Sequence, residues 1–162
     1  MVDIARLGER DWSVYRDLRL ASLAESPSAF GSQLAAEQSR TEAEWRNRLK
    51  HRAQFAAWKE GRAVGMVGCL LEVDSVMDLV SMWVAPPERG TGVADLLIGS
   101  VVAEARSHGC QTLVAWVSNG NEPAERLYRR HGFARTGRLQ PVDAAWPGRG
   151  QEFEMARAVS SR

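Results

Sequence analysis

The apolar positions in the middle of the chain predict three neighbouring strands. Residues 55–58, 63–73 and 76–84 are mostly apolar, and Glu60-Gly61 separates the first two stretches. A polar residue followed by glycine is typical of a tight turn, because glycine adopts positive φ without steric cost. Short connections between consecutive strands favour an antiparallel meander.

Helical spacing is clearest over residues 93–107. Leu97, Val101 and Ala105 recur at the spacing of one helix face, and Gly109 follows as a terminating residue. Other elements have weaker signals. We expect strands over residues 2–7, 111–118, from 133 onward and over 151–158. We expect helices over residues 9–25, from the capping box at Thr41 to about residue 52, and from Pro123 to about residue 131. The capping box is formed by Thr41 and Glu44.

This order of elements predicts a single α/β domain over residues 1–162 with a mixed sheet. Residues 28–40 are polar and predict no element. Residues 139–150 contain two prolines and two glycines, which is typical of a surface loop. Gly65 and Gly68, inside the second strand of the meander, indicate a bulge or a close approach of backbones.

Composition and charge exclude several classes of partner. Charged residues make up 25% of the chain, hydrophobic residues 44%, and the net charge is +1. This balance gives no electrostatic case for binding nucleic acid or a membrane surface. No apolar run approaches the roughly 20 residues of a transmembrane helix, and the first residues do not resemble a signal peptide.

The two cysteines and three histidines predict no metal site. Cys69 and Cys110 are far apart and lie in or beside apolar stretches, so we expect two buried thiols and a reducing, cytoplasmic environment. The histidines are scattered at positions 51, 108 and 131, which is not a metal-ligand spacing.

The segment from Val84 to Ala94 predicts an anion site. It passes from a strand through prolines and glycines into a helix, whose first backbone amides are free to bind an anion. Gly90 and Gly92 lack a Cβ, so an anion can approach closely, and we interpret the loop as a pyrophosphate cradle. It is not a P-loop, because Val93 and Ala94 stand where lysine and Ser/Thr would be. Its place after a meander argues against a dinucleotide fold.

Two motifs resemble the GNAT superfamily of N-acyltransferases. Residues 89–94, Arg-Gly-Thr-Gly-Val-Ala, match its signature Gln/Arg-x-x-Gly-x-Gly/Ala. Residues 121–133 are similar to its second hallmark, Asn-x-x-Ala followed by Leu-Tyr and Gly-Phe. The resemblance covers residues 55–138. It implies a GNAT-like fold, with a mostly antiparallel sheet that splays between its fourth and fifth strands and flanking helices.

The resemblance also implies acetyl-CoA as co-substrate and a set of residues around it. Backbone amides of residues 89–94 would bind the pyrophosphate, and the strand end at Met82 and Val84 would bond the pantetheine arm. Asn121 would bond the same arm, although it is also placed to cap a helix. Tyr128 would protonate the leaving sulfur, although it could simply belong to the core. The expected binding residues are Met82, Trp83, Val84, Arg89, Gly90, Thr91, Gly92, Val93, Ala94, Asn121 and Tyr128.

The expected reaction is direct transfer of an acetyl group from acetyl-CoA to a primary amine of a small molecule, without an acyl-enzyme and without a metal. Two alternatives stay open: acetylation of a protein N-terminus or lysine, and a catalytically silent acyl-CoA-binding module. A homodimer through the final strand pair is expected by analogy only. The general base is open among Glu72, Asp78, Glu122, Glu37, Ser81 and water, and the tryptophans available to line a cleft are Trp45, Trp83, Trp116 and Trp146.

Overall fold

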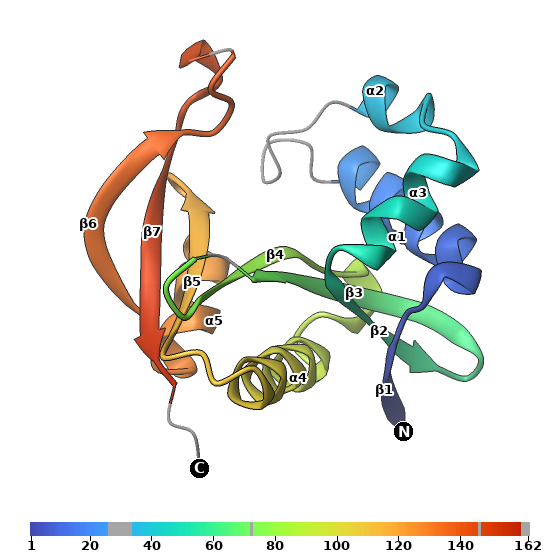
Figure 1. Cartoon of the computed structure of the whole chain (residues 1–162), viewed down its shortest axis with the longest axis horizontal. Coiled ribbons are helices and arrows are strands. Elements are labelled where there is room, and N and C mark those ends of the chain that lie inside the picture. The colour runs from blue at the N-terminus through green and yellow to red at the C-terminus, as the bar shows by residue number, and fades with distance from the viewer. Residues whose placement is uncertain (26–33, 72, 146, 160–162) are drawn as a thin grey trace.

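The structure is a computed structural model, and it describes residues 1–25, 34–71, 73–145 and 147–159. Within these ranges seven strands form one mixed sheet in the order β1-β2-β3-β4-β5-β7-β6 (Figure 1). The strands are β1 (Val2–Arg6), β2 (Ala53–Lys59), β3 (Arg62–Leu71), β4 (Val76–Val84), β5 (Thr112–Ser118), β6 (Ala134–Pro141) and β7 (Gln151–Ala158). β4 and β5 are parallel, and every other neighbouring pair is antiparallel. The predicted meander of β2, β3 and β4 is confirmed.

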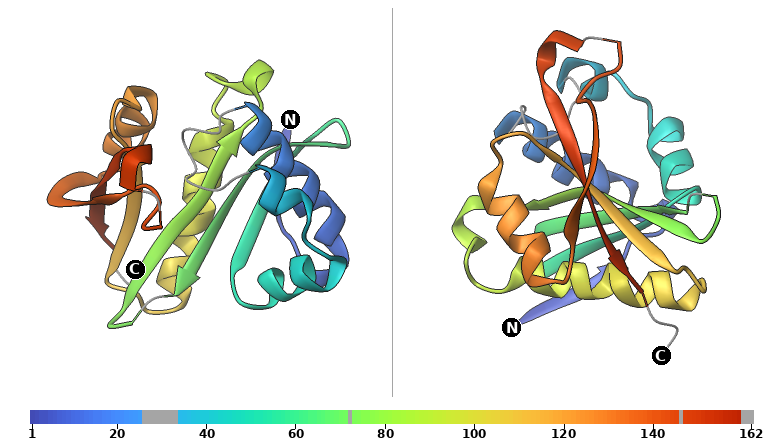
Figure 2. Two further views of the ribbon diagram at one scale, coloured as in Figure 1. Left: turned by 90° about the horizontal axis from the view of Figure 1, so that it is seen from above. Right: turned by 90° about the vertical axis from the view of Figure 1, so that its left-hand side faces the viewer.

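The helices cover both faces of the sheet (Figures 1 and 2). They are α1 (Trp12–Glu25), α2 (Leu34–Gln38), α3 (Glu42–Lys50), α4 (Val93–Ser107) and α5 (Glu122–Arg130). α4 lies against one face, and α1 and α3 lie against the other. The capping box of α3 is confirmed, because the Thr41 side chain accepts a hydrogen bond from the Glu44 amide. None of the described helices is long and apolar enough to cross a membrane.

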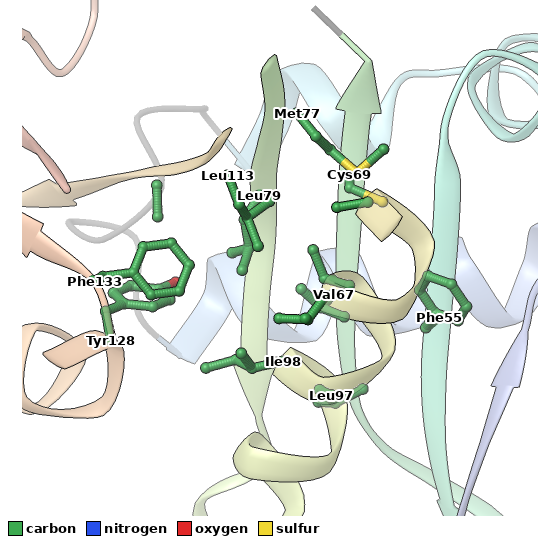
Figure 3. Packing of buried hydrophobic residues seen from close by; sticks show 14 of the residues in the cluster. Phe55, Val67, Cys69, Met77, Leu79, Leu97, Ile98, Leu113, Tyr128 and Phe133 are labelled. Atoms are coloured by element: carbon green, nitrogen blue, oxygen red, sulfur yellow. The ribbon is translucent and has the colours of Figure 1, made fainter. Parts of the chain in front are cut away.

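Alternating strand residues divide the core between the two faces. Phe55 and Val67 pack with Leu97 and Ile98 of α4, as Figure 3 shows. Their strand neighbours Ala56 and Met66 pack on the other face with Tyr15 of α1 and Trp45 of α3. Both cysteines are free thiols in the buried part of the protein, as expected.

Two sequence expectations differ from the structure. The segment over residues 28–40 predicts no element, yet α2 forms over Leu34–Gln38. Its buried residue is the polar Glu37, so the spacing of apolar residues gives no signal for a helix there. The surface loop expected over residues 139–150 begins later, because β6 continues to Pro141 and pairs with β7 that far. Pro141 is tolerated because β6 is the edge strand of the sheet.

Candidate functional site

Strands β4 and β5 separate after a short parallel ladder. Val76–Leu79 pair with Thr112–Ala115, and the pairing then ends although both strands continue. Figure 2 shows β5, β6, β7 and α5 as one group that diverges from β1 to β4. Backbone groups of residues 80–84 that face away from β3 therefore have no strand partner in the described part of the chain. The predicted splay between the fourth and fifth strands is confirmed.

A bulge in β4 lies next to this separation. The register between β3 and β4 shifts just before Gly68, and Ser81 has a φ of 55°. A non-glycine residue at positive φ costs on the order of 1–3 kcal/mol, and a bulge redirects the backbone and side chains around it. A Cβ on Gly68 would lie 2.4 Å from Oε1 of Gln54, so the Gln54 side chain of β2 occupies the space beside this glycine. The register shift lies beside Gly68, but the extra residue belongs to β4, and the close approach of backbones is at Gly65, where a Cβ would lie 3.1 Å from the Trp83 carbonyl oxygen.

Two cavities open at the splay. The first, which we call the loop cavity, has a volume of about 650 Å³ and lies at the connection between β4 and α4. The second, which we call the splay cavity, has a volume of about 440 Å³ and lies between β4 and β5. The two cavities share four lining residues, which are Met82, Asn121, Ala124 and Leu127. The two cavities are therefore adjacent.

The loop cavity brings together most of the predicted binding residues. Eight of the eleven line it: Met82, Trp83, Val84, Arg89, Gly90, Gly92, Ala94 and Asn121. The Thr91 hydroxyl instead donates to the Glu88 carbonyl, and Val93 is buried in the core. Only the backbone of these two residues is left for a ligand, which is the part that the resemblance assigns to the pyrophosphate.

The glycines of the loop are suited to an anion. Gly90 and Gly92 have φ of 77° and 93°, and the space where a Cβ would stand is open to 4 Å at both. Gly92 is also the N-cap of α4, so the first free amides of a fifteen-residue helix follow it. Positive partial charge at a helix N-terminus favours an anionic group. The cradle therefore fits a pyrophosphate.

The Arg89 side chain fastens this loop to the rest of the protein. Its Nε donates to the Val84 carbonyl at 3.0 Å, and its Nη2 lies 2.8 Å from the Glu25 carboxylate. The same carboxylate accepts a hydrogen bond from the Trp83 indole at 3.1 Å. Arg89 thus joins the end of β4 to the end of α1, while its backbone remains part of the cradle.

Asn121 lines both cavities, and Tyr128 lines the splay cavity alone. The Asn121 Oδ1 accepts a hydrogen bond from the Ala124 amide at 3.3 Å, which confirms the helix-capping role. Tyr128 lines the splay cavity, and its ring packs against Phe133 at 5.4 Å between centroids (Figure 3). Burial raises the pKa of Tyr128, so its phenol stays protonated at neutral pH.

This arrangement matches the fold that the sequence motifs imply. The family model described as "Acetyltransferase (GNAT) family" matches residues 17–133, which is most of the chain and includes both motifs. The chain belongs to the acetyltransferase (GNAT) family. Among solved structures, the GNAT-family acetyltransferase of Streptococcus pneumoniae aligns with a TM-score of 0.81 at 20% identity, covering 99% of this chain and 100% of that one. The predicted fold class is confirmed.

Two curated relatives match parts of this chain. An uncharacterized N-acetyltransferase of Mycobacterium tuberculosis is 31% identical over 86 residues, covering 53% of this chain and 55% of the relative. The L-methionine sulfoximine/L-methionine sulfone acetyltransferase of Pseudomonas aeruginosa is 32% identical over 62 residues, covering 38% of this chain and 36% of the relative. The matched region is thus about half of the first relative's length and a third of the second's.

The structure separates the carboxylates that were candidates for a general base in this GNAT protein. Asp78 lines the splay cavity. Glu122 is 78% exposed and pairs with Arg126 outside that cavity. Glu37 is buried and binds three arginines, and their hydrogen bonds hold its pKa below the usual range against the opposing effect of burial. Glu72 lies outside the described residues.

One carboxylate of the cavity has no signal in the sequence. Glu152 of β7 lines the splay cavity, and its Oε1 accepts a hydrogen bond from Gln140 of β6 at 2.6 Å. Burial raises the pKa of Glu152 despite that hydrogen bond. A carboxylate with a raised pKa is a stronger base than an ordinary glutamate. Glu152 stands in a strand of alternating residues, where an outward-facing glutamate is unremarkable, so only the fold reveals its place.

Tryptophans divide between the cavities and the core. Trp116 of β5 lines the splay cavity, with the Arg138 guanidinium 5.6 Å from its ring. Trp83 lines the loop cavity. Trp45 is fully buried against Tyr15 and lines neither cavity. Trp146 lies outside the described residues.

Proposed function

We propose that this protein transfers an acetyl group from acetyl-CoA to a primary amine of a small molecule. The observation that carries the proposal is the pair of adjacent cavities at the splay. The loop cavity has an anion cradle at Gly90 and Gly92, and the splay cavity has a proton donor, Tyr128, and carboxylates. One cavity suits the donor of the acetyl group and the other suits its acceptor.

The reaction needs a proton for the leaving sulfur and stabilisation of negative charge on the acetyl oxygen, and different groups would supply them. Acetyl-CoA supplies an acetyl group activated as a thioester. Nitrogen of the neutral amine bonds to the acetyl carbon, the carbon–sulfur bond breaks, nitrogen loses one proton and sulfur gains one. Tyr128, protonated at neutral pH, would give the proton to sulfur. A backbone amide near Val84 would stabilise the negative charge that develops on the acetyl oxygen.

We place uptake of the amine proton on Glu152. It and Asp78 are the two carboxylates that line the splay cavity in the described residues, and Glu152 has the raised pKa. The other carboxylates considered from the sequence are less suited. Glu37 is held as an anion by arginines, and Glu122 faces away from the cavity.

A small acceptor fits the shape of the splay cavity. Gln140 and Glu152, from the strand pair β6 and β7, close the side of the cavity opposite α1 and α3. The volume of about 440 Å³ accommodates a metabolite-sized molecule. The name of the Pseudomonas relative, an acetyltransferase of L-methionine sulfoximine and L-methionine sulfone, also supports a small acceptor.

The test measures release of free thiol from acetyl-CoA in the presence of amines and peptides. We expect turnover with at least one class of small amine and little with peptides that present a free N-terminus or a lysine. Faster turnover with peptides would favour a protein acceptor. Tight CoA binding with no turnover on any amine would favour a catalytically silent binding module.

A further inference from the structure

Three arginines line one wall of the splay cavity. Arg19 comes from α1, Arg48 from α3, and Arg52 from the segment directly after α3. Arg19 is only 7% exposed, and the other two are partly buried. Three cations on one wall of a cavity of this size repel one another, and their burial is unfavourable unless anions compensate them.

One carboxylate beneath the wall compensates part of this charge. Glu37 accepts hydrogen bonds from Arg19 Nε at 3.2 Å and from both terminal nitrogens of Arg48 at 3.1 and 3.0 Å. It also accepts one from Arg40. A carboxylate has about four lone-pair positions, so these four donors occupy them all. Glu37 thus fixes Arg19 and Arg48 in place but has no capacity left for Arg52.

Arg52 keeps an uncompensated charge. Its Nη1 donates to the Tyr15 hydroxyl at 3.1 Å, and its guanidinium lies 6.0 Å from the centre of the Tyr15 ring. No carboxylate of the described residues lies within ion-pair distance of it. A guanidinium has five N–H donors, so Arg52 retains donors for a ligand in the cavity that it lines.

Aromatic contacts hold this wall rigid. Arg48 lies 5.2 Å from the centre of the Trp45 ring, and Trp45 packs edge to face against Tyr15. Tyr15 in turn holds Arg52. Donors fixed in this way lose little entropy on binding an oxyanion, and the planar fork of arginine matches a carboxylate in two places at once.

The opposite side of the cavity has the opposite charge. Glu152 lines it from β7, and Asp78 lines the cavity from β4, which lies between the two sides. Figures 1 and 2 show α1 and α3 on one side of β4 and the pair β6 and β7 on the other. A ligand that spans the cavity therefore meets guanidinium groups at one end and carboxylates at the other. An amine with no anionic group would satisfy only one end.

We propose that the acceptor is an amino compound that also carries an oxyanion, with the oxyanion bound by Arg52 and Arg48 and the amine directed toward Glu152. The oxyanion can be a carboxylate, as in an amino acid. It can also be a phosphonate or a sulfonate, since all three groups accept hydrogen bonds from a guanidinium. The proposal rests on the acetyltransferase function proposed above and narrows its acceptor to one class.

The test pairs each acceptor with a partner that lacks the charge. The full chain is assayed with acetyl-CoA and the standard L-amino acids, 4-aminobutyrate, 2-aminoethylphosphonate and taurine. Each amino acid is compared with its amide and its decarboxylated amine. A hydrogen bond to a charged group corresponds to about 10-fold to 100-fold in binding. We expect kcat/KM for the preferred oxyanion compound to exceed that for its uncharged partner by that factor. Comparison of kcat/KM among the carboxylates, the phosphonate and the sulfonate identifies the oxyanion that the arginines prefer.

Variants of two arginines tie this preference to the wall. Arg52→Gln should remove most of the preference by raising KM more than it lowers kcat, and Arg52→Lys should restore part of it. Arg46→Gln is the matched control, because Arg46 belongs to α3 but pairs with Glu42 on the surface. It should leave the preference unchanged.

A binding measurement separates this proposal from the proposed function. Calorimetry with the same compounds, without acetyl-CoA, should show binding of the preferred oxyanion that Arg52→Gln weakens and Arg46→Gln does not. Equal turnover of acids, amides and amines would overturn the oxyanion proposal and leave the acetyltransferase function standing. Absence of both binding and turnover for every oxyanion compound would also overturn it. Oxyanion binding without turnover would support the wall and count against the acetyltransferase function.

Discussion

Leu79 of β4 and Ala115 of β5 are the last residue pair in the parallel ladder between these strands. Beyond this pair the two strands no longer bond to each other, and they form walls of two adjacent cavities instead. The end of one ladder therefore does two things. It frees backbone groups of β4 for a ligand in the loop cavity, and it opens the sheet so that a second ligand can approach from the splay cavity.

Removing the Tyr128 hydroxyl should slow catalysis without weakening CoA binding. The Tyr128→Phe variant keeps the ring that packs against Phe133 and loses only the proton donor. General acid catalysis contributes typically 10²–10⁴-fold, so we expect kcat to fall by about that factor. Steady-state kinetics and a CoA titration check this together.

The control for Tyr128 disturbs the same packing but keeps the hydroxyl. Phe133→Leu should lower the free energy of unfolding, since Phe133 is buried, and change kcat far less than Tyr128→Phe does. Unchanged turnover in Tyr128→Phe would exclude this residue as the proton donor.

A side chain on Gly92 should weaken CoA binding. Gly92 has a φ of 93°, so Gly92→Val forces a branched residue into a conformation that costs on the order of 1–3 kcal/mol, and it places atoms in the open space of the cradle. Gly137 of β6 has the same φ and the same open surroundings but lies outside both cavities. Gly137→Val should therefore lose similar stability and keep its CoA affinity. If Gly92→Val keeps the same CoA affinity as Gly137→Val, the loop is not the pyrophosphate cradle.

The local parts of the fold could be predicted from sequence because their signals are local. The capping box at Thr41, the glycines of the loop and the apolar stripe of α4 each depend on neighbours within a few positions. Glycine at positive φ and a free helix N-terminus are properties of the chain itself. Gly90 and Gly92 of this loop line the loop cavity, and acetyl-CoA as its ligand stays a prediction that comes from the family resemblance.

The acceptor side could not be predicted because its residues meet only in the folded protein. In the sequence, the arginines at positions 19, 48 and 52 look like surface charges on two expected helices. Glu152 looks like an outward-facing residue of an expected strand. α2 was missed for the same reason. Its buried residue is Glu37, which is stabilised by arginines from other elements rather than by an apolar face.

The pH profile should identify Glu152 as the proton acceptor. Burial raises its pKa, so the rate of the wild type should fall as the pH drops through that raised value. Glu152→Gln should lower kcat by about 10²–10⁴-fold and remove this acidic limb. Asp78→Asn is the matched comparison, because Asp78 lines the same cavity. If Asp78→Asn removes the limb and Glu152→Gln keeps it, Asp78 is the acceptor instead.

The same substitution should have a pH-dependent effect on stability. A carboxyl group with a raised folded-state pKa stabilises the fold below its ordinary pKa, and this contribution is lost as the pH rises through the folded-state value. Glutamine has no proton to lose. Stability of Glu152→Gln relative to the wild type should therefore increase from pH 4 to pH 8. Urea unfolding at several pH values measures this, and a constant difference would contradict the raised pKa.

Replacing Glu37 should destabilise the protein far more than replacing an exposed glutamate. Glu37→Gln leaves Arg19, Arg40 and Arg48 without their shared anion, and loss of one partner from a buried ion pair costs about 3–5 kcal/mol. Glu42→Gln, which breaks the exposed pair with Arg46, should cost less than about 1 kcal/mol.

Acid should reduce this difference, and the direction follows from the pKa of Glu37. Its folded-state pKa is lowered, so its contribution is present above the ordinary glutamate value near 4.3 and is lost as the pH falls through the lowered value. Urea unfolding should therefore show a large gap between wild type and Glu37→Gln at pH 7 that narrows at strongly acidic pH. A gap that is small at pH 7, or that stays constant into acid, would mean that the arginines do not depend on this carboxylate. The rigid cationic wall of the splay cavity would then need another origin.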